Sequence, residues 1–123
     1  LVPARLADTR ATGSTIDHVF QQTSRPAGGW EHSLSVPISG RGGVATGSGA
    51  VVLTVTAVNP HATGYISVWT CGQGTTASNV NFKAGVNIAN TVIVQPSSMG
   101  EICVLNSVDV DIIIDVSGYF PPV

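Results

Sequence analysis

The feature that most constrains the fold is an alternating pattern over residues 108–120, near the C-terminal end. Read with a period of two, one side of this segment is branched aliphatic: Val108, Val110, Ile112, Ile114 and Val116. The other side is mostly acidic, with Asp109, Asp111 and Asp115 around Ile113. A strand with one continuous aliphatic side is stable only when that side packs against a second layer. The segment therefore predicts a β-strand in a layered, all-β domain.

Extended segments recur along the whole chain, and turn residues separate them. We expect strands at residues 2–9, 31–38, 49–59, 64–71, 79–82, 90–95, 101–106 and 109–116. Residues 59–64 contain Asn, Pro and Gly and are expected to form a hairpin. No window shows a sustained helical period of apolar residues. About eight strands in 123 residues predict one antiparallel β-sandwich module over residues 1–123, of the jelly-roll kind.

The composition limits which binding partners and which location of the protein are expected. Charged residues make up 10% of the chain, and only five Lys and Arg are present, so a nucleic-acid partner is not expected. No apolar run is long enough for a transmembrane helix, so membrane insertion is not expected either. A surface that is polar but nearly uncharged is common in secreted β proteins. The chain begins at Leu1 without a signal-peptide pattern, and we expect it to be cut from a longer secreted protein.

The two cysteines lie in strand-like segments. Neither Cys71 nor Cys103 belongs to a C-x-x-C pair or a metal knuckle. The sequence favours one disulfide between them, which indicates an oxidising compartment. The alternative is two buried free thiols that behave as small apolar side chains. Trp69 shares a strand face with Cys71 and is expected to pack on the disulfide.

Three segments together resemble a module that recurs in secreted and cell-surface proteins of actinobacteria and related bacteria. They are residues 3–10 (PARLADTR), 78–82 (SNVNF) and 115–120 (DVSGYF). The opening motif of the module reads P-x-R-L-L-D-T-R, so Ala7 replaces its second leucine here, while Asp8 and Arg10 are kept. The module often follows a catalytic or other domain and has no established chemistry. The resemblance implies an extracellular accessory module and no particular activity.

Several acidic residues are candidates for an ion pair or a metal site. The first and last strands of a sandwich often lie side by side, so Arg10 is expected to pair with Asp8 or Asp115. We interpret this cluster as a structural ion pair; an acid/base pair in a cleft is the alternative. Asp109 and Asp111 are weaker candidates for a calcium-binding site. Calcium needs six to eight oxygen ligands, and no calcium-loop motif is present. We expect no metal and no cofactor.

Sugar-binding modules present aromatic faces flanked by polar side chains. Trp30 lies in a loop-like segment beside Glu31 and His32, and these three residues are candidates for contact with a glycan. Asn79 and Asn81 could bind sugar hydroxyls. In each case the structural alternative is packing, or satisfaction of backbone groups in irregular connections.

Nothing in the sequence predicts catalysis. The chain has no G-x-S-x-G elbow, and its three histidines are far apart and lack metal-ligand spacing. We therefore expect a non-catalytic extracellular module that attaches to polysaccharide or cell-wall glycan. The main alternative is a structural unit that self-assembles into a surface layer or fibre, in which case the module forms homo-oligomers. A hydrolase is the third possibility.

Overall fold

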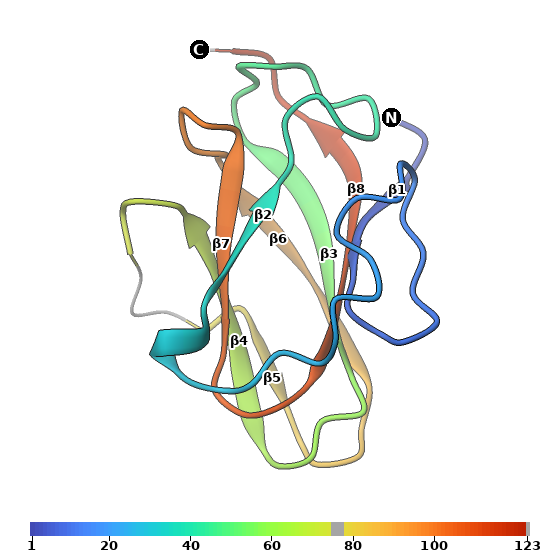
Figure 1. Cartoon of the computed structure of the whole chain (residues 1–123). Helices are drawn as coiled ribbons and strands as arrows, with labels where there is room; N and C mark the ends of the chain where they lie inside the picture. The colour runs from blue at the N-terminus through green and yellow to red at the C-terminus, as the bar shows by residue number, and fades with distance from the viewer. Residues whose placement is uncertain (75–77, 123) are drawn as a thin grey trace.

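The computed structural model describes residues 1–74 and 78–122, and at Trp30 it describes the backbone only. Within these described residues, eight β-strands make up the fold (Figure 1). They are β1 (Ala4–Asp8), β2 (Leu34–Pro37), β3 (Val51–Val58), β4 (Gly64–Thr70), β5 (Val80–Phe82), β6 (Ile88–Val94), β7 (Glu101–Asn106) and β8 (Asp111–Tyr119). One short 3-10 helix, η1 (Trp30–His32), precedes β2. Each predicted extended segment overlaps one of these strands, although β6 begins before the predicted segment 90–95 and β8 ends after the predicted segment 109–116.

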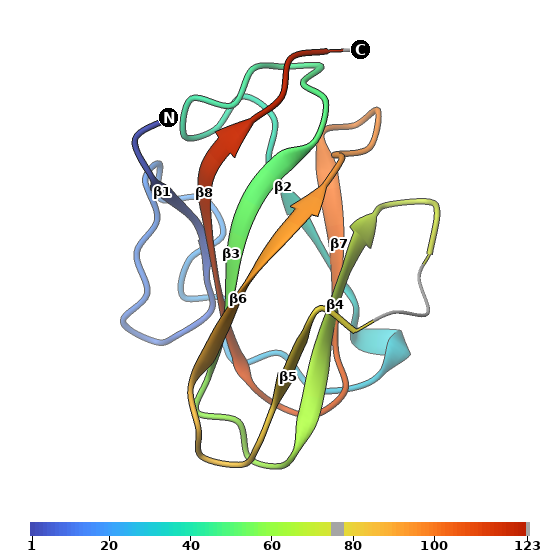
Figure 2. The same cartoon turned by 180° about the vertical axis from the view of Figure 1, so that it is seen from behind.

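The strands form two four-stranded sheets that pack face to face. Sheet A has the order β1-β8-β3-β6 and sheet B the order β2-β7-β4-β5, and all neighbouring strands are antiparallel. Figure 2 shows the four strands of sheet A side by side. Strands that follow one another in the chain lie in different sheets, except β4 and β5. This order is that of an eight-stranded jelly roll made of two Greek keys, and it confirms the predicted fold.

The alternation of apolar residues places the core between the sheets. In β3 the four residues that face inward are completely buried: Val51, Leu53, Val55 and Ala57. Sheet B packs against them with buried Ile66, Val68, Ile102 and Val104. Burial of one such Val, Leu or Ile side chain stabilises the fold by about 1.5–3 kcal/mol.

The second face of β8 is covered at one end and open at the other. Asp111 and Ile113 are only 8% and 6% exposed, although the alternating pattern predicts a solvated face. The segment that follows β1 covers this end: Thr9 Oγ1 donates a hydrogen bond of 2.7 Å to Asp111, and Arg25 forms an ion pair of 3.0 Å with the same carboxylate. Further along β8, Asp115 remains partly exposed on this face. The open part of sheet A is therefore the part around Asp115.

Two local predictions are wrong. Residues 59–64 do not form a hairpin, because β3 and β4 belong to different sheets. Residues 31 and 32 belong to η1 instead of the predicted extended segment 31–38, because Gly29 adopts a φ of 113° and its carbonyl accepts the His32 N–H at 3.1 Å.

Cys71 and Cys103 form the predicted disulfide, with 32 residues of sequence separation. Trp69 in β4 lies directly opposite Cys103 in β7 and is half-buried, so the indole shares the outer face of sheet B with the disulfide. Among the residues that the structure describes, no helix is both long enough and apolar enough to cross a membrane.

Candidate functional site

A row of polar side chains crosses the outer face of sheet A, from one edge to the other. Arg5 in β1 lies opposite Asp115 in β8, Asp115 lies opposite Thr54 in β3, and Thr54 lies opposite Thr91 in β6. Thr54 stands between two buried core residues of β3, so its own side chain points away from the core. The row therefore faces solvent.

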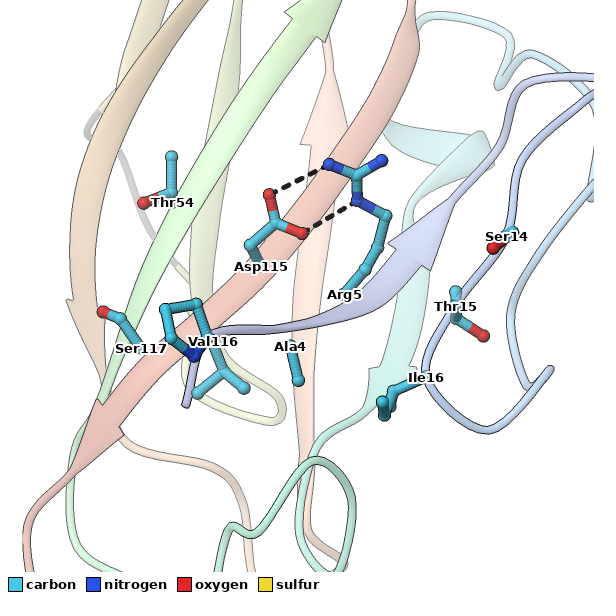
Figure 3. A pocket seen from close by; sticks show the side chains of 10 residues that line it. Ala4, Arg5, Ser14, Thr15, Ile16, Thr54, Asp115, Val116 and Ser117 are labelled. Carbon is cyan, nitrogen blue, oxygen red and sulfur yellow. Dashed lines mark hydrogen bonds and ion pairs between the residues drawn. The ribbon is translucent and has the colours of Figure 1, made fainter. Parts of the chain in front are cut away.

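An ion pair occupies the β1 end of this row. Arg5 Nε donates a hydrogen bond of 2.8 Å to Asp115 Oδ1, and Nη2 lies 3.4 Å from Oδ2. Figure 3 shows the guanidinium and the carboxylate directed at one another. The bond to Asp115 is the main cause that raises the pKa of Arg5. The two side chains are 38% and 29% exposed, so they hold each other in place and remain accessible to a ligand.

The ion pair lies in an open depression of about 740 Å³. The depression is lined by Pro3, Ala4, Arg5, Ser14, Thr15, Ile16, Thr54, Asp115, Val116 and Ser117. In Figure 3, residues 14–16 of the loop after β1 stand on one side of the ion pair, and Thr54 and Ser117 stand on the other. The floor is thus formed by the sheet, and one wall is formed by the loop.

Asp8 holds the beginning of the loop that forms this wall. Its carboxylate is completely buried and accepts two hydrogen bonds of 2.9 Å from the guanidinium of Arg10. The backbone N–H groups of Arg10 and Ser14 donate to the same carboxylate at 3.3 Å. The hydrogen bond from Arg10 is the main cause that lowers the pKa of Asp8. A carboxyl group held ionised in this way is not a proton donor near neutral pH, which favours the structural interpretation of this cluster over an acid/base pair.

The sequence left open whether Arg10 meets Asp8 or Asp115, and the structure pairs it with Asp8. The partner of Asp115 is Arg5, which sequence reasoning missed. The sequence held no local signal for Arg5, because only the antiparallel register of the first and last strands brings residues 5 and 115 together.

A second ion pair, between buried Arg41 and exposed Asp17, holds the rest of the wall. Arg41 is 8% exposed, and its Nε and Nη2 donate hydrogen bonds of 2.8 Å to the two oxygens of Asp17. The same guanidinium donates to the carbonyl oxygens of Pro37 and Val19. The bond from Arg41 is the main cause that lowers the pKa of Asp17 well below its usual range. Because this anchor is bidentate, the loop that carries Ser14 and Thr15 is fixed before any ligand arrives.

The residues predicted to contact a glycan lie elsewhere. The side chain of Trp30 is outside the described part of the structure, while Glu31 and His32 are exposed in η1, next to β2. Asn79 immediately precedes β5, and Asn81 lies within it. Because β2 and β5 are opposite edges of sheet B, the structure does not bring these two groups together.

The two asparagines have different roles. Asn79 Oδ1 accepts the Val68 N–H at 2.7 Å, and the Asn79 carbonyl accepts a hydrogen bond of 2.8 Å from Asn90 Nδ2. Asn79 therefore links β4, β5 and β6. Asn81 is exposed and lines a separate, mainly apolar depression with Phe82 and Ile88.

The carboxylates considered for calcium are occupied by protein groups. Asp109 precedes β8 and accepts the Gly28 N–H at 3.0 Å, and Asp111 is held by Thr9 and Arg25. Across residues 1–74 and 78–122, no group of three or more His, Cys, Asp or Glu side chains is placed to hold a metal ion.

No protein-family model and no curated protein matches the sequence. Among solved structures, the chain is similar to the coat protein of Tobacco streak virus, described as a dimer. The TM-score is 0.46 and the sequence identity 9%, and the match covers 81% of this chain and 82% of the coat protein. The assignment as a jelly roll rests on the strand order and register of the chain itself.

Proposed function

We propose that this chain is a non-catalytic extracellular module that attaches to polysaccharide, such as cell-wall glycan, through the depression on the outer face of sheet A. The observation that carries the proposal is the exposed Arg5–Asp115 pair in the floor of that depression, beside the hydroxyl groups of Ser14 and Thr54. This location differs from the glycan site expected at Trp30. It is chosen because accessible polar groups converge in the depression on sheet A.

The chemistry of the floor suits sugar hydroxyls. Each hydroxyl both donates and accepts hydrogen bonds, and a guanidinium beside a carboxylate offers donors and acceptors in one plane. Arg5 has five N–H donors; Nε and Nη2 bind Asp115, Nη1 lies 3.6 Å from Asp8 Oδ2, and 38% of the side chain remains exposed. Since the ion pair and the buried anchors already fix these groups, binding orders few side chains. The opposite charges of Arg5 and Asp115 balance, which favours a neutral glycan.

The arrangement of carboxylates supports binding without hydrolysis. A glycosidase of the common kind places two carboxyl groups on either side of the scissile bond. Asp115 is the single acidic residue among those that line the depression, and it is paired with Arg5. The nearby Asp8 is buried beneath Arg10. The disulfide supports an extracellular location, since disulfides persist in oxidising compartments.

The test is binding to a panel of soluble oligosaccharides and insoluble polysaccharides, by calorimetry and by co-sedimentation. We expect Arg5→Gln to weaken binding at least about tenfold, the effect of losing one charge-assisted hydrogen bond of about 1.5–3 kcal/mol. Thr54→Ala is expected to weaken binding, whereas Thr56→Ala, two residues along the same face of β3 and outside the lining, is the matched control.

Three outcomes would overturn the proposal. The first is that the unaltered chain binds no glycan in the panel. The second is equal binding by the Thr54→Ala and Thr56→Ala variants together with normal binding by Arg5→Gln. The third is loss of binding in Trp30→Ala alone, which would return the site to η1.

A further inference from the structure

The two sheets have four edge strands, and three of them are protected. The edge of β1 is occupied by the loop that follows it: the Asp8 N–H donates to the Phe20 carbonyl at 3.1 Å, and the Gln22 N–H donates to the Asp8 carbonyl at 2.9 Å. In sheet B, β5 has only three residues, and β2 has four and ends at Pro37. Short edge strands and proline prevent pairing with another chain.

The fourth edge, β6, lacks these protections. Its seven residues, IANTVIV, include no charged residue and no proline. Ile93 and Ile88 are 61% and 42% exposed. An uncharged edge strand of this length is a template for pairing with a further strand.

The backbone groups of β6 that point outward can be identified from one hydrogen bond. The Thr91 N–H donates to the side chain of its neighbour Asn90 at 3.0 Å, in an exposed position, so it is not directed at β3. The N–H groups of an antiparallel strand alternate between its two sides. The N–H groups of Ala89 and Ile93 therefore point outward as well.

We infer that β6 pairs antiparallel with β6 of a second copy of this chain, about a two-fold axis at Thr91. In this register Thr91 lies opposite its own copy, and Ala89 lies opposite Ile93 of the partner subunit. A small side chain then faces a large one on the outer side of the sheet, and the two-fold axis repeats the same contact. Since β6 carries no charge, the two copies do not repel each other along the strand. A strand that is its own complement fits a second copy better than an unrelated peptide.

This pairing has a geometrical consequence. Two strands that pair antiparallel about an axis perpendicular to their sheet keep the same face on the same side. The dimer would contain one continuous sheet of eight strands, with both depressions directed the same way. If the depressions bind glycan as proposed above, the dimer would engage one polysaccharide surface at two points and gain avidity. The dimer itself does not depend on that function.

The test is the mass of the full chain in solution, measured by light scattering from about 1 to 200 μM. We expect the mass to rise with concentration from one chain to two. Thr91→Lys places two like charges face to face on the axis, and Ile93→Lys adds a charge to the exposed edge, so both variants are expected to remain monomers. Val19→Lys, an exposed aliphatic residue of the loop after β1, is the control and is expected to dimerise normally.

A second measurement covers the case in which a lysine variant folds poorly. Thr91→Cys is expected to form a covalent dimer under mild oxidation, seen on a non-reducing gel, whereas Thr56→Cys on the adjacent strand β3 is not. A monomer at every concentration, or dimers that persist in both lysine variants, would overturn the inference. Binding of a short oligosaccharide by a monomeric Ile93→Lys variant separates the two proposals, because Ile93 neither lines the depression nor belongs to the polar row.

Discussion

Arg5 and Asp115 are direct cross-strand neighbours in β1 and β8, and their side chains meet at 2.8 Å on the open face of sheet A. More than a third of the Arg5 side chain is exposed. Exposed ion pairs of this kind contribute only about 0–1 kcal/mol to stability. The pair is therefore accessible to a ligand and is not required to hold the fold.

The first prediction is that the Arg5–Asp115 pair contributes little to the stability of the fold. We expect Arg5→Gln to change the free energy of unfolding by less than about 1 kcal/mol, because water replaces the contact with Asp115 and Asp8 keeps its two bonds to Arg10. Urea denaturation followed by circular dichroism measures it. A loss several times larger would show that Arg5 is structural, and would weaken any interpretation of its effect on glycan binding.

The second prediction concerns Asp8, which is completely buried. Asp8→Ala removes the partner of the Arg10 guanidinium and the acceptor of the Ser14 N–H. Breaking a buried ion pair by removal of one partner destabilises by about 3–5 kcal/mol. The same urea titration is the measurement, with Arg5→Gln as the exposed counterpart. Equal stability of the two variants would contradict the assignment of Asp8 as the anchor of the loop.

The third prediction is loss of stability in acid. Folding lowers the pKa of Asp8 and of Asp17, because each carboxylate is bound by an arginine. Unfolded aspartates titrate near about 3.9. The stabilisation is therefore complete above the unfolded pKa and is lost as the pH falls through the lower folded values. The urea midpoint should be flat between about pH 5 and 7 and fall below about pH 4; stability that rises on acidification would contradict this.

Asp17→Asn is the matched variant for the acid measurement. It should be less stable than the unaltered chain at neutral pH, because it breaks the bidentate contact with Arg41. It should also show a shallower decline in acid, since one of the two carboxylates with a lowered pKa is absent. If its decline matches that of the unaltered chain, Asp17 does not contribute to the acid dependence.

The fourth prediction concerns the disulfide between Cys71 and Cys103. For a loop closed over 32 residues of sequence separation, the chain-entropy relation gives a loss of about 3–4 kcal/mol on removal of the crosslink. Replacement of both cysteines by serine, followed by thermal unfolding, measures it. A melting temperature unchanged by the double substitution would contradict this account of the crosslink.

The fifth prediction uses two glycines. A Cβ at Gly13 would lie 2.6 Å from the Asp8 carbonyl oxygen, whereas a Cβ at Gly118 meets nothing within 4 Å. Gly13→Ala must therefore shift the backbone beside Asp8 and is expected to destabilise by about 1–3 kcal/mol. Gly118→Ala, in β8, should be neutral or slightly stabilising. Similar effects at both positions would contradict the close approach of Gly13.

The fold could be predicted well from the sequence, because the alternation of buried and exposed residues along each strand decides most of it. Alternation of apolar residues in β3 and β8 locates strands and their buried faces without knowledge of the partners. The rule carries no information about which strands pair. For that reason residues 59–64 were mistaken for a hairpin, although the chain there passes from one sheet to the other.

The site was less predictable, because its residues become neighbours only through the register of distant strands. Arg5 and Asp115 are 110 residues apart, and Arg41 and Asp17 are 24 apart, in loops with no periodic signal. Asp8 was recognised as a candidate partner of Arg10 because the first and last strands of a sandwich often lie side by side, an argument that could not choose between Asp8 and Asp115. Trp30 was selected by its residue type and its loop-like segment, neither of which indicates where a side chain lies.

The position of β1 and β8 also has a mechanical consequence. The two strands are antiparallel neighbours, and the two ends of the chain lie at the same end of the sandwich (Figure 1). A force that pulls the ends apart would load the hydrogen bonds between these strands one pair at a time, from Ala4–Val116 towards Asp8–Ile113. Strands pulled in this way unzip at low force, whereas strands sheared along their length resist together. Under tension, β1 would peel away first and take Arg5 from the candidate site before the core opens.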